Sequence, residues 1–126
     1  MFKGKKILIT GGTGSLGTSL TERLLTLDVD TIKHALANKI PVVFGMSIYE
    51  SFMSEATTTT GVVSMPKNTE VLIGGHAMML VGYDKSNFIV RNSWGDKWGD
   101  SGYCYVPYDY LTDSNLAEDF WAVEMV

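Results

Sequence analysis

His76, Asn92 and Trp94 are the residues of this sequence whose types and spacing could do chemistry together. The histidine follows two glycines, the asparagine lies sixteen residues further on, and the tryptophan comes two residues after that. A histidine can take up and return a proton, a polar side chain can orient its imidazole ring, and an aromatic ring can shield that hydrogen bond from water. The set predicts acid–base chemistry at His76 of the kind that supports a thiolate nucleophile.

The sequence offers no obvious nucleophile to accompany this set. Its one cysteine, Cys104, lies beyond both the histidine and the asparagine, in a Gly-Tyr-Cys-Tyr segment. We expect Cys104 to be a small buried hydrophobic residue. A single cysteine also excludes an internal disulfide and a multi-cysteine metal site. The aspartates show no metal-ligand spacing, so we predict no metal and no cofactor.

A β-hairpin must bring His76 and Asn92 together. Residues 76–83 and 88–92 read as strands, and the Asp-Lys-Ser-Asn segment between them has turn chemistry. If facing residues have numbers that add to 171, His76 and Asn92 lie on opposite faces of the sheet. If the numbers add to 170, the two residues are diagonal neighbours on one face, roughly 7–8 Å apart. We predict the second register, or a bulge with the same effect, with Trp94 near the pair.

The other elements predict an α+β fold dominated by an antiparallel, β-barrel-like sheet. Asp30 is a plausible N-cap for a helix that carries Ile32, Ala35 and Leu36 and ends near Asn38. Further strands are predicted at residues 41–49, 102–106 and 120–126, and residues 57–61 read as a polar loop.

Residues 28–126 resemble the papain family of cysteine peptidases. The segments that carry the resemblance are Gly74-Gly-His76-Ala, Val81-Gly-Tyr83-Asp, Asn92-Ser-Trp-Gly95, Trp98-Gly-Asp-Ser-Gly-Tyr103 and Pro107-Tyr. The resemblance implies a papain-like C-terminal half-domain whose reaction is the hydrolysis of peptide bonds. In it, His76 matches the catalytic histidine, Asn92 the asparagine that orients it, and Trp94 the tryptophan that covers their contact.

The same resemblance implies that half of the active site is missing from these residues. The family's nucleophilic cysteine begins a long helix in the other half of the fold, and a glutamine shortly before it completes the oxyanion hole. We therefore expect this chain to be inactive alone and to act on a peptide or protein substrate only when a cysteine-bearing half complements it. An uncovered half-fold should also expose an apolar face, which predicts self-association and leaves open a non-catalytic interaction module.

The first 27 residues form a separate segment that reads as strand, glycine turn and helix. Residues 6–10 are an apolar run, and leucines recur at helical spacing from residue 16 to residue 27. With Gly11, Gly14 and Gly17 between them, the segment resembles the start of an extended short-chain dehydrogenase/reductase. The resemblance implies that these glycines bind a dinucleotide. A nucleotide-binding, oxidoreductase-related fragment is therefore the alternative function, although the family's Tyr-x-x-x-Lys pair is absent.

Length and charge limit the remaining possibilities. The 126 residues allow one domain with a short appendage, and 45% of them are hydrophobic, which suits a folded core. A net charge of −4 argues against nucleic-acid binding. No apolar run approaches the ~20 residues of a membrane helix, and the apolar stretch after the first lysines is too short for a signal peptide. We expect no membrane association and, by default, a cytoplasmic location.

Overall fold

The computed structural model describes the backbone of residues 6–10, 18–23 and 28–125. The described strands form one seven-stranded antiparallel sheet in the order β1-β2-β7-β3-β4-β5-β6. Along the chain the elements are β1 (Lys6–Thr10), β2 (Thr18–Arg23), α1 (Val29–Ala37), β3 (Val42–Tyr49), the 3-10 helix η1 (Glu50–Met53), α2 (Glu55–Thr60), β4 (Leu72–Tyr83), β5 (Asn87–Arg91), β6 (Tyr103–Pro107), α3 (Tyr108–Leu111) and β7 (Ala117–Met125).

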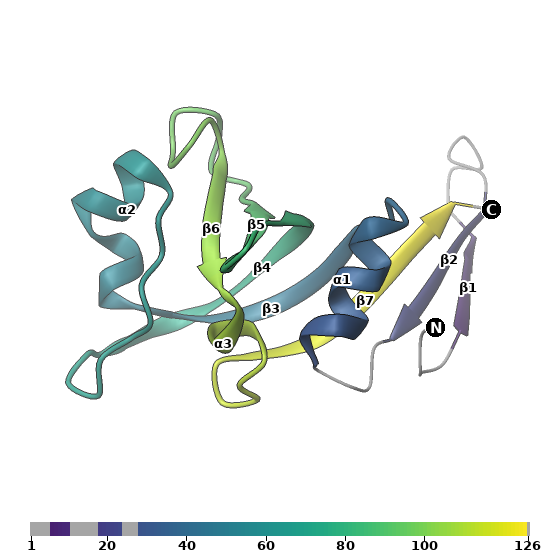
Figure 1. Cartoon of the computed structure of the whole chain (residues 1–126), viewed down its shortest axis with the longest axis horizontal. Coiled ribbons are helices and arrows are strands. Elements are labelled where there is room, and N and C mark those ends of the chain that lie inside the picture. The colour runs from purple at the N-terminus through teal and green to yellow at the C-terminus, as the bar shows by residue number, and fades with distance from the viewer. Residues whose placement is uncertain (1–5, 11–17, 24–27, 126) are drawn as a thin grey trace.

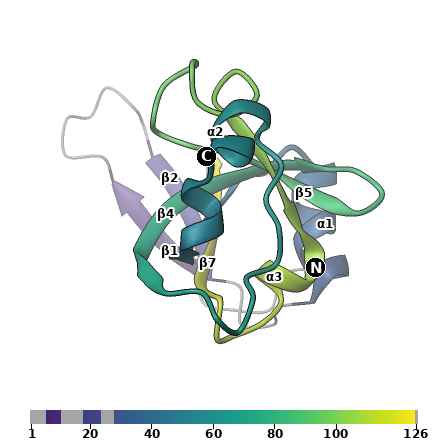
Figure 2. The same ribbon diagram turned by 90° about the vertical axis from the view of Figure 1, so that its left-hand side faces the viewer.

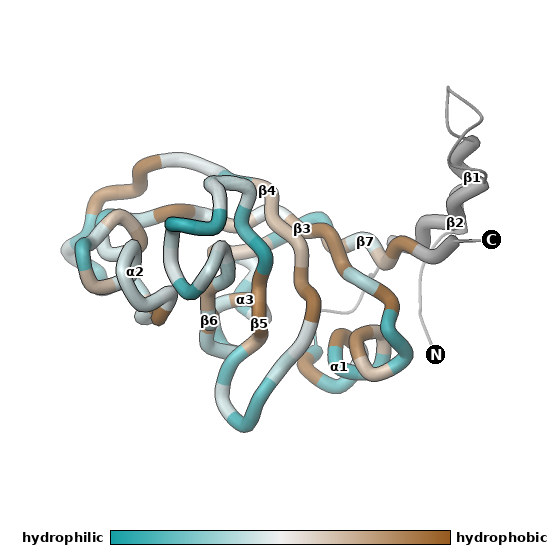
Figure 3. The backbone as a smooth tube through the Cα atoms, turned by 90° about the horizontal axis from the view of Figure 1, so that it is seen from above, coloured by the Kyte–Doolittle hydropathy of each residue, from teal (hydrophilic) through white to brown (hydrophobic). Residues whose placement is uncertain are grey.

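The sheet twists along its length (Figures 1 and 2). Buried hydrophobic residues of α1, of strands β3 to β7 and of the segments between them form one core cluster. Alternate residues of β3 face this core, and hydrophobic stretches recur along β3 and β5 in Figure 3. Phe44 of β3 stacks on Phe120 of β7 with ring centroids 5.4 Å apart, which joins the two strands through the core. The architecture confirms the α+β class predicted from the sequence.

Helix α1 packs on the sheet through Ile32, Ala35 and Leu36, as the sequence predicted. Its N-cap is Asp28 rather than the predicted Asp30, because an Asp28 carboxylate oxygen accepts a hydrogen bond from the Thr31 backbone N–H at 2.7 Å. The helix ends at the predicted position, since Asn38 is its C-cap.

The polar loop predicted at residues 57–61 is wrong, because most of it belongs to helix α2. Ser54 caps this helix by accepting a hydrogen bond from the Thr57 backbone N–H. The Thr57 hydroxyl in turn donates to the carbonyl of Val62 at 2.9 Å. A run of threonines reads as non-helical because their hydroxyls compete for backbone groups, but here those hydrogen bonds hold the short helix in place.

The helix predicted after Gly17 is also wrong over residues 18–23, which form strand β2. This strand pairs with β1 on one side and with β7 on the other, both antiparallel. Backbone hydrogen bonds to β7 are a tertiary effect that leucine spacing cannot reveal, and the β-branched Thr18 and Thr21 suit a strand. The parallel strand–helix–strand unit of a dinucleotide site is thus not formed by these described residues.

The remaining predicted strands are all present in the structure, but their first and last residues differ from the predicted ones. Strand β4 starts at Leu72, four residues before its predicted start, and β7 starts at Ala117, three residues before its own. The last predicted residue, Val126, lies outside the described residues. Within the described part of the chain, no helix has the length and apolar character needed to cross a membrane.

Candidate functional site

The hairpin of β4 and β5 has the register that the sequence predicted next to His76. Met79 pairs with Arg91 and Leu80 with Val90, so the facing numbers add to 170. A bulge after Leu80 changes the register towards the turn, where Asp84 accepts hydrogen bonds from two backbone N–H groups. The turn and the bulge together place His76 and Asn92 as diagonal neighbours.

The two side chains are in direct hydrogen-bond contact. His76 Nε2 lies 2.8 Å from Asn92 Oδ1. The same Oδ1 accepts a second hydrogen bond, from the Ser93 backbone N–H at 2.7 Å. Because a backbone N–H can only donate, this second bond identifies the amide atom that faces His76 as the oxygen.

The identity of that oxygen assigns the proton on the neutral imidazole ring. Asn92 Oδ1 can only accept a hydrogen bond, so His76 Nε2 must carry the hydrogen. Nδ1 of the neutral ring then has a free lone pair and can take up a proton. The geometry of Asn92 therefore leaves His76 ready to act as a base through Nδ1.

Asn92 is held in place at an energetic cost. It is 3% exposed, and its Nδ2 has no hydrogen-bond partner among the described residues. A buried donor without a partner costs about 1–3 kcal/mol. An asparagine in this position is poorly explained by stability alone, whereas its oxygen serves both His76 and Ser93.

An aromatic cluster surrounds the hydrogen-bonded pair. Trp94 stacks on the His76 ring with centroids 4.9 Å apart and an interplanar angle of 24°. Trp98 and Phe52 pack behind Trp94 at 5.4 Å and 5.8 Å. Trp94 itself is 42% exposed, and the His76 side chain beneath it is partly exposed.

Cys104 lies in the core, as the sequence predicted. It is fully buried in β6, where its backbone pairs with Val90 of β5. Burial raises the pKa of its thiol to about 12. At neutral pH this side chain is a thiol rather than a thiolate, and thus a poor nucleophile.

The structure leaves the predicted glycine site untested. Gly11, Gly14 and Gly17 lie outside the described residues, so dinucleotide binding by these glycines stays a prediction. Within the described residues, no group of three His, Cys, Asp or Glu side chains is placed to hold a metal ion.

Two hollows beside His76 were not predicted from the sequence. The first, called here the outer cleft, has a volume of about 310 Å³ and is lined by residues of β3, β4 and β7 and by the segment before β7. The second, of about 240 Å³, is lined by His76 and by three exposed apolar residues, Met53, Ile73 and Trp94, called here the apolar rim. Each hollow is lined by segments that are far apart in the chain, so the spacing of residues along the sequence did not predict either hollow.

Comparisons with known proteins identify relatives of this chain. Residues 16–122 match the profile described as papain family cysteine protease. An uncharacterized peptidase C1-like protein of Acanthamoeba polyphaga mimivirus is 51% identical over 100 residues, which cover 78% of this chain and 32% of that protein. Pro-cathepsin H of Mus musculus is 32% identical over 80 residues, which cover 60% of this chain and 23% of that protein.

A solved structure agrees with these sequence matches. Xylellain, a cysteine protease from Xylella fastidiosa, matches with a TM-score of 0.77 and 38% sequence identity. The match covers 84% of this chain and 40% of xylellain. The chain thus spans about a third of the mimiviral relative and less than half of xylellain.

Proposed function

The chain belongs to the papain family of cysteine proteases, and from that premise we propose that it supplies the histidine–asparagine half of a peptide-hydrolysing site. His76 is the general base and acid, Asn92 orients its ring, and Trp94 shields the hydrogen bond between them. The observation that carries the proposal is the 2.8 Å contact between His76 Nε2 and Asn92 Oδ1 beneath the stacked Trp94 ring.

The nucleophile of this site comes from outside these 126 residues. Cys104 is buried and has a raised pKa, so it cannot present a thiolate to a substrate. A second copy of the chain does not help, because both copies contain the same single cysteine. The isolated chain is therefore inactive on peptides, and a cysteine-bearing half completes the site.

The apolar rim supports the proposal that a separate protein part supplies the cysteine. Met53, Ile73 and Trp94 expose hydrophobic surface directly beside His76. Exposed apolar residues that gather around a polar site mark a surface that another protein part covers. The cysteine-bearing half is the proposed occupant, because only its arrival at this surface brings a thiol to the imidazole.

Complementation tests the proposal. The chain is assayed with a fluorogenic peptide, first alone and then after co-purification with the part of xylellain that lies outside the matched region. We expect no turnover by the chain alone and measurable turnover by the pair. His76→Ala should abolish the activity of the pair, because no other described group replaces the imidazole beside Asn92.

Two results separate this proposal from its alternatives. Turnover by the isolated chain that disappears with His76→Ala would show that the nucleophile lies within these residues. A stable, correctly assembled pair that stays inactive would instead favour a non-catalytic interaction module. Asn92→Ala should lower the activity of the pair without abolishing it, as expected for a residue that orients the base.

A further inference from the structure

We propose that Met53 is an oxidation site, at which a peroxide converts the thioether to a sulfoxide and so weakens the docking of a partner on the apolar rim. This inference rests on the proposed function, because it concerns the surface that the cysteine-bearing half covers. It is carried by the exposure of Met53, by the contacts that fix its position, and by the apolar character of the hollow that it lines.

Met53 is the most exposed of the methionines whose side chains the structure describes. It is 50% exposed, whereas Met46 and Met78 are 2% and 5% exposed and Met79 is partly buried. A peroxide must reach the sulfur atom in order to oxidise it, so the exposed thioether reacts before the buried ones.

Met65 is also exposed, at 41%, but its surroundings differ from those of Met53. It lines another hollow, which contains several polar and charged side chains. These are Tyr49, Lys67, Asn68, Glu70 and Asp113. A sulfoxide at Met65 would join other polar groups, so this residue is the matched comparison for Met53.

The neighbours of Met53 hold it at the rim. Phe52, which precedes it in η1, is 1% exposed and packs on Trp94 with ring centroids 5.8 Å apart. The backbone N–H of Ser51, also in η1, donates to a carboxylate oxygen of Glu70 at 2.8 Å. Because these contacts anchor η1, the thioether is presented at a fixed place beside Trp94.

The hollow at the rim offers few partners to a polar group. Its lining residues are Ile48, Met53, Ile73, Gly74, Gly75, His76 and Trp94. Apart from one imidazole and one indole N–H, these side chains are apolar or absent. A sulfoxide oxygen is a hydrogen-bond acceptor, and burying an acceptor without a donor is unfavourable. A partner that covers the rim therefore docks less well on the oxidised chain.

The reaction needs only a peroxide as co-reactant. The sulfur of Met53 attacks one oxygen of hydrogen peroxide, the O–O bond breaks, and water leaves. The sulfur is oxidised to the sulfoxide and the peroxide is reduced. Enzymes that reduce methionine sulfoxide restore the thioether, so the change is reversible.

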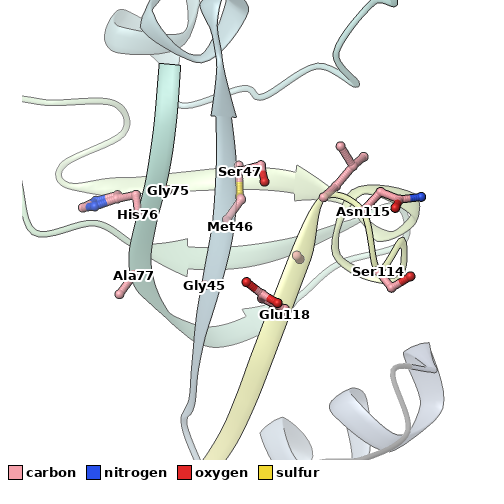
Figure 4. A pocket seen from close by; sticks show the side chains of 11 residues that line it. Gly45, Met46, Ser47, Gly75, His76, Ala77, Ser114, Asn115 and Glu118 are labelled. Carbon is pink, nitrogen blue, oxygen red and sulfur yellow. The ribbon is translucent and has the colours of Figure 1, made fainter. Parts of the chain in front are cut away.

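The rim is also the side towards which the His76 ring turns. In Figure 4 the imidazole points away from Ser114 and Glu118 of the outer cleft. The ring stacks instead on Trp94 of the rim. A chemical change at Met53 therefore alters the surface on which the imidazole lies, away from the outer cleft.

Oxidation of the full 126-residue chain tests the inference without catalysis. The chain is treated with dilute hydrogen peroxide, and sulfoxides are located by peptide mass spectrometry. Apolar dye binding and self-association are measured before and after treatment. We expect Met53 to be oxidised well before Met46 and Met78, and self-association to weaken about tenfold, with a matching fall in dye binding. The thermal midpoint should stay unchanged, because Met53 lies outside the core cluster.

Three variants assign the effect to one sulfur atom. Met53→Leu keeps an apolar side chain of similar size that peroxide does not oxidise, so the treated variant should keep its dye binding and self-association. Met65→Leu should lose both on treatment, as the wild-type chain does. Met53→Gln places a polar amide at the rim and should weaken both without any oxidant.

Four results would overturn the inference. They are oxidation of Met53 no faster than that of Met46 and Met78, equal losses in the treated wild-type and Met53→Leu chains, an oxidised Met53 with unchanged dye binding and self-association, and an untreated wild-type chain that binds no dye. In the last case the rim would offer no apolar contact to weaken. None of these results bears on whether His76 acts in hydrolysis, which the complementation assay decides separately.

Discussion

The side-chain oxygen of Asn92 accepts hydrogen bonds from two donors, and this double role has a measurable consequence at His76. With Asn92 present, the neutral ring carries its proton on Nε2. Asn92→Ala removes the acceptor, so we expect the two neutral tautomers of His76 to become mixed. Nitrogen NMR of the histidine ring at high pH measures the tautomer ratio directly.

Asn92→Asp is the matched control for that measurement. Its carboxylate keeps an oxygen opposite His76 Nε2, so the Nε2–H tautomer should persist. It also removes the buried amide Nδ2, which has no partner among the described residues. An unchanged tautomer ratio in Asn92→Ala would show that something other than Asn92 holds the ring.

At the scale of elements, Glu70 links the segment before β4 to η1. Its two carboxylate oxygens accept hydrogen bonds from the backbone N–H groups of Lys67 at 2.7 Å and of Ser51 at 2.8 Å. Glu50, in η1, accepts one in return from the backbone N–H of Val71 at 2.6 Å. These contacts fix the approach to β4, the strand that carries His76.

The hydrogen bonds to Glu70 predict a loss of stability in acid. Those from the backbone of Lys67 and then of Ser51 hold the pKa of Glu70 below its ordinary value of 4.5. A carboxylate with a lowered pKa stabilises the fold above its unfolded pKa, and this contribution is lost as pH falls through the folded value. We expect the thermal midpoint of the wild-type chain to fall as the pH drops below about 4.5.

Glu70→Gln should make this part of the pH dependence flatter and should lower the midpoint at neutral pH. Glu118→Gln is the control, since no partner of its carboxylate is found among the described residues. The experiment compares the thermal midpoints of the three proteins over a series of pH values. A Glu70→Gln curve parallel to that of the wild-type chain would contradict the prediction.

The sequence predicted those elements whose signals are local. The register of β4 and β5 followed from the turn at Asp84 and from the spacing of His76 and Asn92, and both lie within one hairpin. The helical signal of α1 likewise comes from apolar residues on one face of a short segment.

The elements that the sequence missed depend on contacts between distant segments. Residues 18–23 form a strand because the edge of β7 pairs with them, and β7 lies about a hundred residues later in the chain. The bulge at Asp119 arises where β7 meets β3, so alternation within β7 alone gave no sign that Glu118 faces outwards. In both cases, strand β2 and the bulge in β7, pairing with a distant strand overrides the structure that the local sequence pattern predicts.

At the scale of the whole molecule, the apolar rim predicts self-association of the isolated chain. Ile73 is 57% exposed and lies beside the exposed Met53 and Trp94. We expect apolar dye binding and a sedimentation coefficient that rises with concentration, because pairing of two rims removes apolar surface from water. Ile73→Ser should weaken both effects.

Val81→Ser provides the comparison, because Val81 is also exposed but lies in a different hollow, beside α1. It removes exposed apolar surface away from the rim, although Val81 is less exposed (38%) than Ile73 (57%), and should leave association unchanged. If both variants reduce association equally, general surface hydrophobicity rather than the rim is responsible.

The position of Cys104 makes the chain a convenient substrate for chemical labelling. It is the one cysteine of the sequence, and its thiol is sealed inside the fold with a raised pKa. Maleimide reagents need an accessible thiolate, so the native wild-type chain should react slowly. A cysteine introduced at an exposed position such as Met53 would be the fast-reacting thiol. A fluorophore or spin label placed there would report the docking of a partner, with Cys104 left in place.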